Sequence, residues 1–102
     1  MTTSSEKIYK GYPFVMMAKI TDTESMVSAT KLEMRYLKPG ATQYATLTAT
    51  VVNGTIDTIE AKVLAANNNV AGVWTFWPYV ENSNGDGMPG TPIQVTIYPE
   101  GT

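Results

Sequence analysis

Hydrophobic and polar positions alternate along several short runs of this chain, which is the pattern of β-strands with one buried face. The clearest run is Gly72 to Glu81, GVWTFWPYVE. One face of this predicted strand carries Trp74, Phe76, Pro78 and Val80. Trp77 and Tyr79 fall on the opposite face. We therefore predict a strand that packs against a core on one side and presents aromatic side chains on the other.

Shorter runs of the same kind predict the remaining strands. They cover Ile8–Tyr12, Phe14–Ile20, Lys31–Leu37, Tyr44–Val52, Thr55–Val63 and Thr91–Tyr98. Because proline cannot donate to a ladder, Pro13 marks either a sheet edge or a change of partner between the first two runs. In the last run, alternation predicts that Ile93, Val95 and Ile97 face inward.

Turn-forming residues separate these runs. Asn53-Gly54 is the favoured pair for a two-residue type I′ hairpin turn, so Thr55–Val63 is the expected return strand. The polar segments Thr21–Ser28 and Asn82–Gly87 are predicted to be loops. Leu64–Ala71 contains three consecutive asparagines and is too short for a stable isolated helix, so a helical turn or a loop is expected there.

The number and spacing of these runs indicate the fold class. About six to seven strands, with turns roughly every 8 to 12 residues, predict an all-β, antiparallel β-sandwich. A length of 102 residues fits a single domain, 1–102, that buries its own core. Residues 1–6 are expected to form a flexible N-terminal arm.

Composition narrows the classes of partner. Charged residues make up 16% of the chain, below the roughly 25% usual for globular proteins, which suits a surface that packs against neighbours. The net charge of −2 and a single arginine, Arg35, argue against nucleic acid as a partner. No apolar run approaches the roughly 18 residues of a membrane span. The polar start MTTSSEK is unlike a signal peptide, so we expect the chain to be retained in a cytoplasm at first.

The residues that most enzymes use are missing. The chain has no histidine and no cysteine, which removes the usual general base, the thiol nucleophile, the zinc-ligand sets and disulfides. Asp22 with Glu24, and Asp57 with Glu60, resemble the paired carboxylates of a glycosidase. Solvated charge is the preferred interpretation of both pairs, and no catalytic residue is assigned.

Two short motifs also have a simpler interpretation. Asn82 to Gly87, NSNGDG, resembles the start of a calcium-binding loop, but its first ligand is uncharged and Ile93 stands where the bidentate glutamate belongs. A plain loop is preferred, and no metal or cofactor is predicted. Asn53-Gly54-Thr55 matches the glycosylation pattern, which matters only in a eukaryotic secretory pathway, so the hairpin interpretation is preferred.

Five short segments resemble a family of small structural proteins of tailed bacteriophages, whose pattern is roughly ATxxxLxxxKPDG…WTATV…AGTWxLxAYV. The segments are Ser28–Leu32, Leu37–Gly40, Thr48–Asn53, Ala71–Trp74 and Pro78–Val80. The similarity extends from Ile8 to Tyr98. The chain departs from the pattern at Gly40, which replaces the Asp of KPDG, and at Asn67–Asn69, where the family is usually acidic.

The resemblance implies an immunoglobulin-like domain that is a head decoration, head fibre, tail or baseplate component of the virion, assembled in the host cytoplasm. Its implied partners are other virion proteins of the capsid or tail, and a homo-oligomer is a further option. The alternative function is a tail-associated carbohydrate- or receptor-binding module, in which the Asn82–Gly90 loop and the aromatic face stack on sugars.

The aromatic residues of the Gly72–Glu81 run have different expected roles. Trp74 is expected in the core, as are the methionines, including Met16, Met17 and Met34. If the run pairs with the final strand, Trp77 and Tyr79 share an outer face with Gln94. Chemistry alone supports sheet stabilisation and an interface equally for this face. The resemblance favours the interface, whose predicted residues are Trp77, Tyr79, Tyr98 and Leu37.

Overall fold

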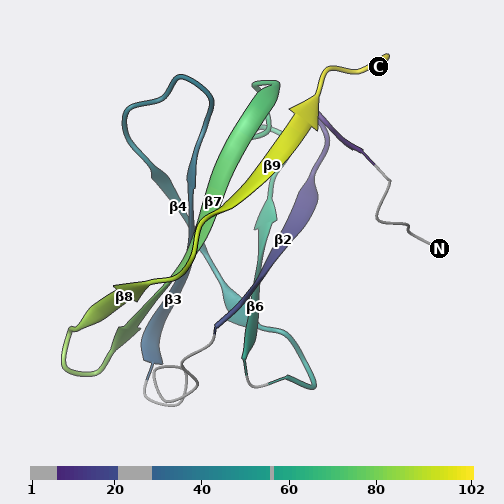
Figure 1. Cartoon of the computed structure of the whole chain (residues 1–102). Helices are drawn as coiled ribbons and strands as arrows, with labels where there is room; N and C mark the ends of the chain where they lie inside the picture. The colour runs from purple at the N-terminus through teal and green to yellow at the C-terminus, as the bar shows by residue number, and fades with distance from the viewer. Residues whose placement is uncertain (1–6, 21–28, 56) are drawn as a thin grey trace.

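The computed structural model describes residues 7–20, 29–55 and 57–102 (Figure 1). These residues form nine strands, joined by turns and loops, and no helix. The strands are β1 (Ile8–Tyr9), β2 (Phe14–Lys19), β3 (Ala29–Leu37), β4 (Ala45–Thr48), β5 (Thr50–Val51), β6 (Thr58–Val63), β7 (Gly72–Asn82), β8 (Gly87–Pro89) and β9 (Ile93–Tyr98). The predicted all-β class is confirmed. The described residues include no helix long and apolar enough to cross a membrane.

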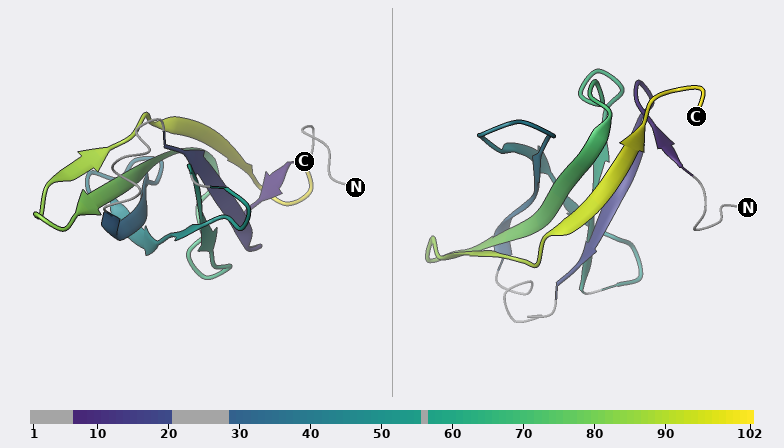
Figure 2. Two further views of the ribbon diagram at one scale, coloured as in Figure 1. Left: turned by 90° about the horizontal axis from the view of Figure 1, so that it is seen from below. Right: turned by 45° about the horizontal axis from the view of Figure 1, so that its top comes forward.

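The described strands form two sheets that pack as a sandwich (Figures 1 and 2). The large sheet has the order β1-β9-β7-β3-β4, and β8 pairs with β7 beyond the start of β9. The small sheet has the order β2-β6-β5. The strand pairs are antiparallel except one, because β1 runs parallel to β9. This pairing arises because the chain reaches the edge of β9 before it crosses to the small sheet.

Two of the places where the chain changes sheets are Pro13, between two predicted strands, and Ala49, inside one. Pro13 lies between β1, an edge of the large sheet, and β2, an edge of the small sheet, so both of the alternatives left open for it, a sheet edge and a change of partner, are present. The predicted strand Tyr44–Val52 is divided, since β4 pairs with β3 whereas β5 pairs with β6. Ala49 stands at the crossing point, is buried, and its N–H donates to Leu32 O at 3.0 Å.

The core lies between the sheets and is centred on stacked aromatic rings. The ring centroids of Tyr36 and Trp74 are 5.5 Å apart, and those of Trp74 and Phe76 are 5.9 Å apart. The indole N–H of Trp74 donates to Val70 O at 2.9 Å, which satisfies the polar atom of this fully buried side chain. The predicted core role of Trp74 is confirmed.

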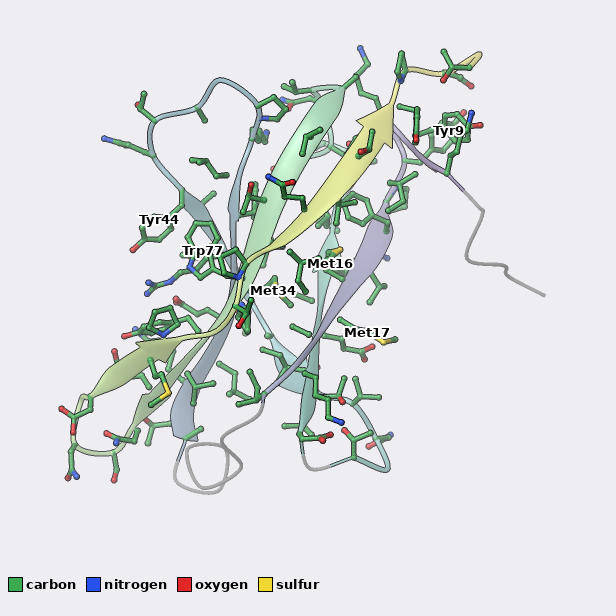
Figure 3. All side chains as sticks on the ribbon, in the orientation of Figure 1. Tyr9, Met16, Met17, Met34, Tyr44 and Trp77 are labelled. Atoms are coloured by element: carbon green, nitrogen blue, oxygen red, sulfur yellow. The ribbon has the colours of Figure 1, made fainter. Side chains whose placement is uncertain are left out.

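Two predicted core positions are exposed instead. Met16 and Met34 are buried as predicted, whereas Met17 is 55% exposed and points away from both sheets (Figure 3). Alternation explains this, because adjacent residues of β2 face opposite sides and Met16 takes the inner one. Along β9, Ile97 is fully buried, but Ile93 is 39% exposed at the first position of the strand.

The hairpin at Asn53-Gly54 forms, but not with the predicted turn. A type I′ turn needs positive φ at both central residues, and among the described residues only glycines have positive φ. Gly54 has φ of 85°, so it is the one residue of the pair in the left-handed region. The backbone N–H of Thr55 donates to Val52 O at 3.1 Å and closes the turn, and the Thr55 hydroxyl donates to the same oxygen at 2.8 Å. The return strand therefore begins at Thr58 rather than at Thr55.

The predicted loop at Asn82–Gly87 is present over residues 83–86, as the connection of a hairpin. Asn82 is the last residue of β7 and Gly87 is the first of β8. The side-chain Oδ1 of Asn82 accepts the N–H groups of Asn84 at 3.0 Å and Asp86 at 3.1 Å, which orders the turn. Leu64–Ala71 forms turns, within the range predicted, whereas the predicted loop Thr21–Ser28 and the predicted arm 1–6 lie outside the described residues.

Candidate functional site

The outer face of the large sheet presents the aromatic side chains predicted from the alternation of β7. Trp77 and Tyr79 are half-buried there, whereas their neighbours Phe76, Pro78 and Val80 are buried in the core. The final strand β9 does pair with β7, but along Gly72–Phe76, so Trp77 and Tyr79 lie beyond the paired stretch. Trp77 is instead paired with Arg35 of β3, and Tyr79 is paired with Glu33 of β3 and Pro89 of β8.

Arg35 joins the aromatic rings of this face into one cluster. Its guanidinium carbon lies 3.5 Å from the ring centroid of Tyr79 and 4.9 Å from that of Tyr44. The ring of Tyr44 meets Trp77 edge-on at 5.6 Å between centroids (Figure 3). We call Arg35, Tyr44, Trp77 and Tyr79 the aromatic cluster. A guanidinium between two rings is a cation–π arrangement, which holds long side chains in fixed positions.

Two carboxylates, those of Glu33 and Glu81, interact with Arg35 and Tyr79 of the cluster. Glu33 Oε1 lies 3.2 Å from Arg35 Nε, and the side chains of this pair are 20% and 19% exposed. The phenol of Tyr79 donates to Glu81 Oε1 at 2.9 Å. This hydrogen bond, together with burial and the negative charge of Glu81, raises the pKa of Tyr79 above its usual value, and Arg35 acts in the opposite direction. At neutral pH the Tyr79 hydroxyl is therefore a protonated donor.

The ring of Tyr79 also depends on a glycine on the neighbouring strand. A Cβ atom at Gly87 would collide with the Tyr79 phenol, so the ring lies directly over the bare backbone of β8. An aromatic ring that covers a glycine on the adjacent strand is a known device for stabilising a sheet edge. The hairpin of β7 and β8 thus fixes the position of Tyr79.

The other two predicted site residues do not join the cluster. Leu37 is half-buried and paired with Thr75, one step along the outer face from Arg35 and Trp77. Tyr98 is the last residue of β9, at the end of that strand farther from Trp77, and Lys7 Nζ is 4.8 Å from its ring centroid. Because Gly72 is already paired with Ile97, Tyr98 and Trp77 are separated by roughly 20 Å along the strands.

Sequence reasoning missed Arg35 and Tyr44 as members of the site. Arg35 was predicted to lie on the face of its strand opposite Met34 and Tyr36 and was noted as the single arginine, and Tyr44 was predicted only as the start of a strand, but neither was assigned to a site. The available signal was the position of Arg35 in its predicted strand, where alternation already places it opposite Met34 and Tyr36. Its neighbours across the sheet depend on strand pairing, which the sequence does not specify.

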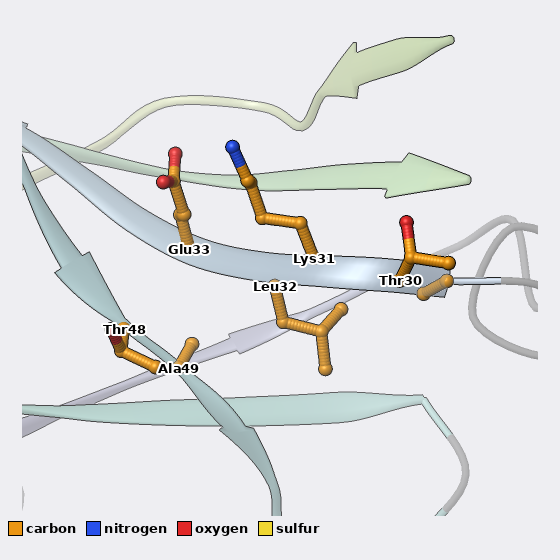
Figure 4. Close-up of a pocket in the computed structure, with 7 residues that line it drawn as sticks. Thr30, Lys31, Leu32, Glu33, Thr48 and Ala49 are labelled. Atoms are coloured by element: carbon orange, nitrogen blue, oxygen red, sulfur yellow. The ribbon is translucent and has the colours of Figure 1, made fainter. Parts of the chain in front are cut away.

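A hollow of about 400 Å³ lies where the chain leaves the large sheet between β4 and β5 (Figure 4). It is lined by Ala29, Thr30, Lys31, Leu32, Glu33, Thr48 and Ala49. Leu32 projects to the opposite side of β3 from Lys31 and Glu33, so the lining side chains do not converge on one point. A hollow of this kind lacks the few converging polar groups of a typical small-molecule site.

The predicted carboxylate pairs give no catalytic arrangement among the described residues. Asp57 lies 3.6 Å from Lys19 Nζ and accepts a hydrogen bond from Thr58 at 3.1 Å, which is a structural role. Asp22 and Glu24 lie outside the described residues. In residues 7–20, 29–55 and 57–102, no group of three or more acidic side chains is placed to hold a metal ion.

The aromatic cluster thus offers aromatic rings, a cation paired with Glu33, and tyrosine hydroxyl groups on one face of the sheet. Such a surface is suited to contact with another surface, since aromatic residues and arginine dominate the energetics of protein interfaces. A scan against protein-family models and a search of curated proteins found no match for this chain.

Proposed function

We propose that this chain is a non-enzymatic, immunoglobulin-like structural protein of a tailed-bacteriophage virion, and that it docks on the head or tail through the outer face of its large sheet. The observation that carries the proposal is the aromatic cluster, in which Arg35 is held between Tyr44 and Tyr79 beside Trp77. The partner is another virion protein of the capsid or tail, and assembly takes place in the host cytoplasm.

The order of the strands supports the immunoglobulin-like part of the proposal. Immunoglobulin domains place strands B, E and D in one sheet and G, F and C in the other. Assigning B to β2, E to β6 and D to β5 reproduces the small sheet, and assigning G to β9, F to β7 and C to β3 reproduces the large one. One difference is that the buried tryptophan, Trp74, is on the strand assigned as F rather than on C.

Contacts between two of the segments that resemble the phage family also support the proposal. The Leu37–Gly40 turn and the Ala71–Trp74 segment are far apart in the chain, yet a Cβ atom on Gly72 would lie 2.8 Å from Cγ of Pro39. Lys38 Nζ lies 5.3 Å from the ring centroid of Trp74. Gly72 has φ of 131°, so both its backbone and its neighbour favour glycine at this position. Close packing therefore gives a physical reason for residues of these types in both segments.

The rigidity of the cluster favours tight docking. A partner surface that covers Trp77 orders few additional side chains, because the Trp77 ring already packs against Tyr44, which in turn contacts Arg35. Affinity is gained when the ordering of side chains takes place before association. The cluster also has its charges paired within the protein, so docking does not bury an isolated Arg35.

The test is the number of copies of the protein on purified particles. Trp77→Ala is expected to leave the isolated domain folded and to lower its affinity for particles by about 30-fold, which corresponds to a hot-spot contribution of about 2 kcal/mol. Val73→Ala is a matched control, because Val73 is on the same strand and 49% exposed but outside the cluster. Quantitative mass spectrometry of virions grown with each variant measures the copy number. Full loading of Trp77→Ala would place the interface elsewhere.

The alternative function is a tail-associated module that binds carbohydrate through the aromatic face and the Asn82–Gly90 loop. The ring faces of the cluster are suitable for stacking on sugars, whereas Oδ1 of Asn82 already accepts two backbone N–H groups of its own turn. A structural role predicts many copies per particle and no measurable glycan affinity. Few copies, together with glycan binding that Trp77→Ala abolishes, would favour the alternative.

A further inference from the structure

Strand β2 is an edge of the small sheet, and within the described residues only β6 pairs with it. Edge strands present unpaired N–H and C=O groups that can join a strand of another chain, and proteins usually protect them with charges, prolines or bulges. Here Pro13 precedes the strand and Lys19 ends it, with the sequence FVMMAK from Phe14 to Lys19. The centre of this edge therefore lacks the usual protection.

The register of β2 with β6 identifies which backbone groups point away from the sheet. The N–H of Ile20 donates to Asp57 O at 2.6 Å, in line with the pairing of Ala18 with Ile59. Because hydrogen-bonded pairs alternate along an antiparallel ladder, the even-numbered residues of β2 bond to β6. The odd-numbered residues, Val15, Met17 and Lys19, direct their N–H and C=O groups to the open edge.

The same residues carry the exposed side chains of β2. Val15 is 50% exposed and Met17 is 55% exposed, and both lie on the face of the small sheet that is turned away from the core. An apolar strip and a row of unpaired backbone groups thus coincide on Val15 and Met17. Each feature taken alone is common on protein surfaces, but together they are typical of a site for strand addition.

We propose that β2 pairs antiparallel with β2 of a second copy of this chain, about a two-fold axis that passes through Met17. In this register Met17 lies opposite Met17 of the second copy, and Val15 lies opposite its Lys19. All three outward-facing residues of one copy then meet outward-facing residues of the other, so every N–H and C=O group along the edge gains a partner. The two small sheets become one continuous sheet.

The charges on this edge are compatible with self-pairing. Two lysines directly opposite each other would be destabilising, but this register sets each Lys19 against Val15. Lys19 Nζ also lies 3.6 Å from Asp57 Oδ2 of its own chain, which partly balances its charge. The inference goes beyond the proposed function, because it uses the edge of the small sheet and leaves the aromatic cluster of the large sheet free to dock.

The test is sedimentation equilibrium of the full chain. Substitutions at residue 17 are the most informative, because Met17 lies opposite itself in the proposed dimer. The wild type is expected to show a concentration-dependent mass that approaches twice 11.1 kDa. Met17→Lys and Met17→Glu each place like charges opposite one another and are expected to remain monomeric. An equimolar mixture of the two variants is expected to restore the dimer, because Lys then faces Glu across the two-fold axis.

A control variant and a backbone measurement separate this edge from other surfaces. Val51→Lys adds the same charge on β5, at the other edge of the small sheet, where Val51 is 42% exposed, and it is expected to leave the dimer intact. Amide exchange in the wild type is expected to slow at Val15, Met17 and Lys19 as the concentration rises. Deletion of residues 1–6 is expected to leave the chain dimeric.

Several results would overturn the inference. A wild type that stays at 11.1 kDa up to its solubility limit, or amides of Val15 and Met17 that exchange at the same rate at all concentrations, would show that β2 does not self-pair. A mixture of Met17→Lys and Met17→Glu that stays monomeric would exclude the proposed register. Loss of the dimer in Val51→Lys, or on deletion of residues 1–6, would assign the contact to another part of the chain.

Discussion

At the scale of single residues, Trp74 and Trp77 occupy the same strand and have opposite surroundings. Trp74 is fully buried between Tyr36 and Phe76, so Trp74→Ala leaves a large cavity and removes the indole hydrogen bond to Val70. We expect a loss of roughly 3 to 5 kcal/mol in the free energy of unfolding, which is a large part of the total for a domain of this size. Urea unfolding of Trp74→Ala and Trp77→Ala measures the difference. Equal destabilisation by the two variants would contradict the assignment of faces.

Asn68 is a second residue whose loss the core should not tolerate. Its side-chain Nδ2 donates to Tyr9 O at 2.8 Å and to Tyr12 O at 2.7 Å, and its backbone O accepts the N–H of Gly11. Asn68→Leu leaves the carbonyls of Tyr9 and Tyr12 without these donors, so we expect it to lower the free energy of unfolding by about 1 to 3 kcal/mol. Thermal unfolding is a suitable measurement.

Asn69→Ala is the matched control for Asn68→Leu. Asn69 is the next residue of the same loop, but it is exposed and makes a surface hydrogen bond with Lys38. We expect this change to have little effect on the melting temperature. If both variants melt like the wild type, Asn68 does not hold the Leu64–Ala71 loop against the segment that joins β1 to β2.

At the scale of secondary-structure elements, the sequence was sufficient wherever one face of a strand is buried. The alternation of Gly72–Glu81 correctly predicted both faces of β7, and the proline at position 13 indicated a sheet edge or a change of partner, both of which are present there. The sequence was not sufficient where pairing between distant strands decides the ends of a strand and the sheet to which it belongs. The predicted strand Tyr44–Val52 is divided at Ala49 because its first half pairs with β3 and its second half pairs with β6. Nothing in the local sequence indicates this division.

The same limit applies to turns and to the candidate site. Asn53-Gly54 has a strong type I′ preference, but only Gly54 of the pair has positive φ, so the turn closed by Thr55 N–H and Val52 O is of a different type. Tyr79 and Trp77 were placed on the correct face by local alternation, whereas their contact with Arg35 follows from the pairing of β3 with β7. Asn68 looked like one of three equivalent asparagines, because nothing in the local sequence indicates which of them is buried.

At the scale of the whole molecule, the path of the chain couples the two sheets. The chain passes from one sheet to the other between β1 and β2, between β2 and β3, between β4 and β5, and between β6 and β7. Contacts across the sandwich follow, such as the edge-on pair of Phe14 and Phe76 at 6.0 Å between centroids. The small sheet alone, with the three described strands β2, β5 and β6, has no other surface on which to bury Ile59 and Val63.

We therefore expect the domain to unfold in one cooperative transition. In urea, the backbone amides of Ile59 in the small sheet and Phe76 in the large sheet should lose their native nuclear magnetic resonance signals at the same midpoint. Far-ultraviolet circular dichroism should give that midpoint as well. Because neither sheet can bury its inner face without the other, a variant that destabilises one sheet should shift both midpoints equally, and Met16→Ala in β2 is suitable since Met16 is buried. Separate midpoints for Ile59 and Phe76 would mean that the crossings between the sheets do not couple their stability.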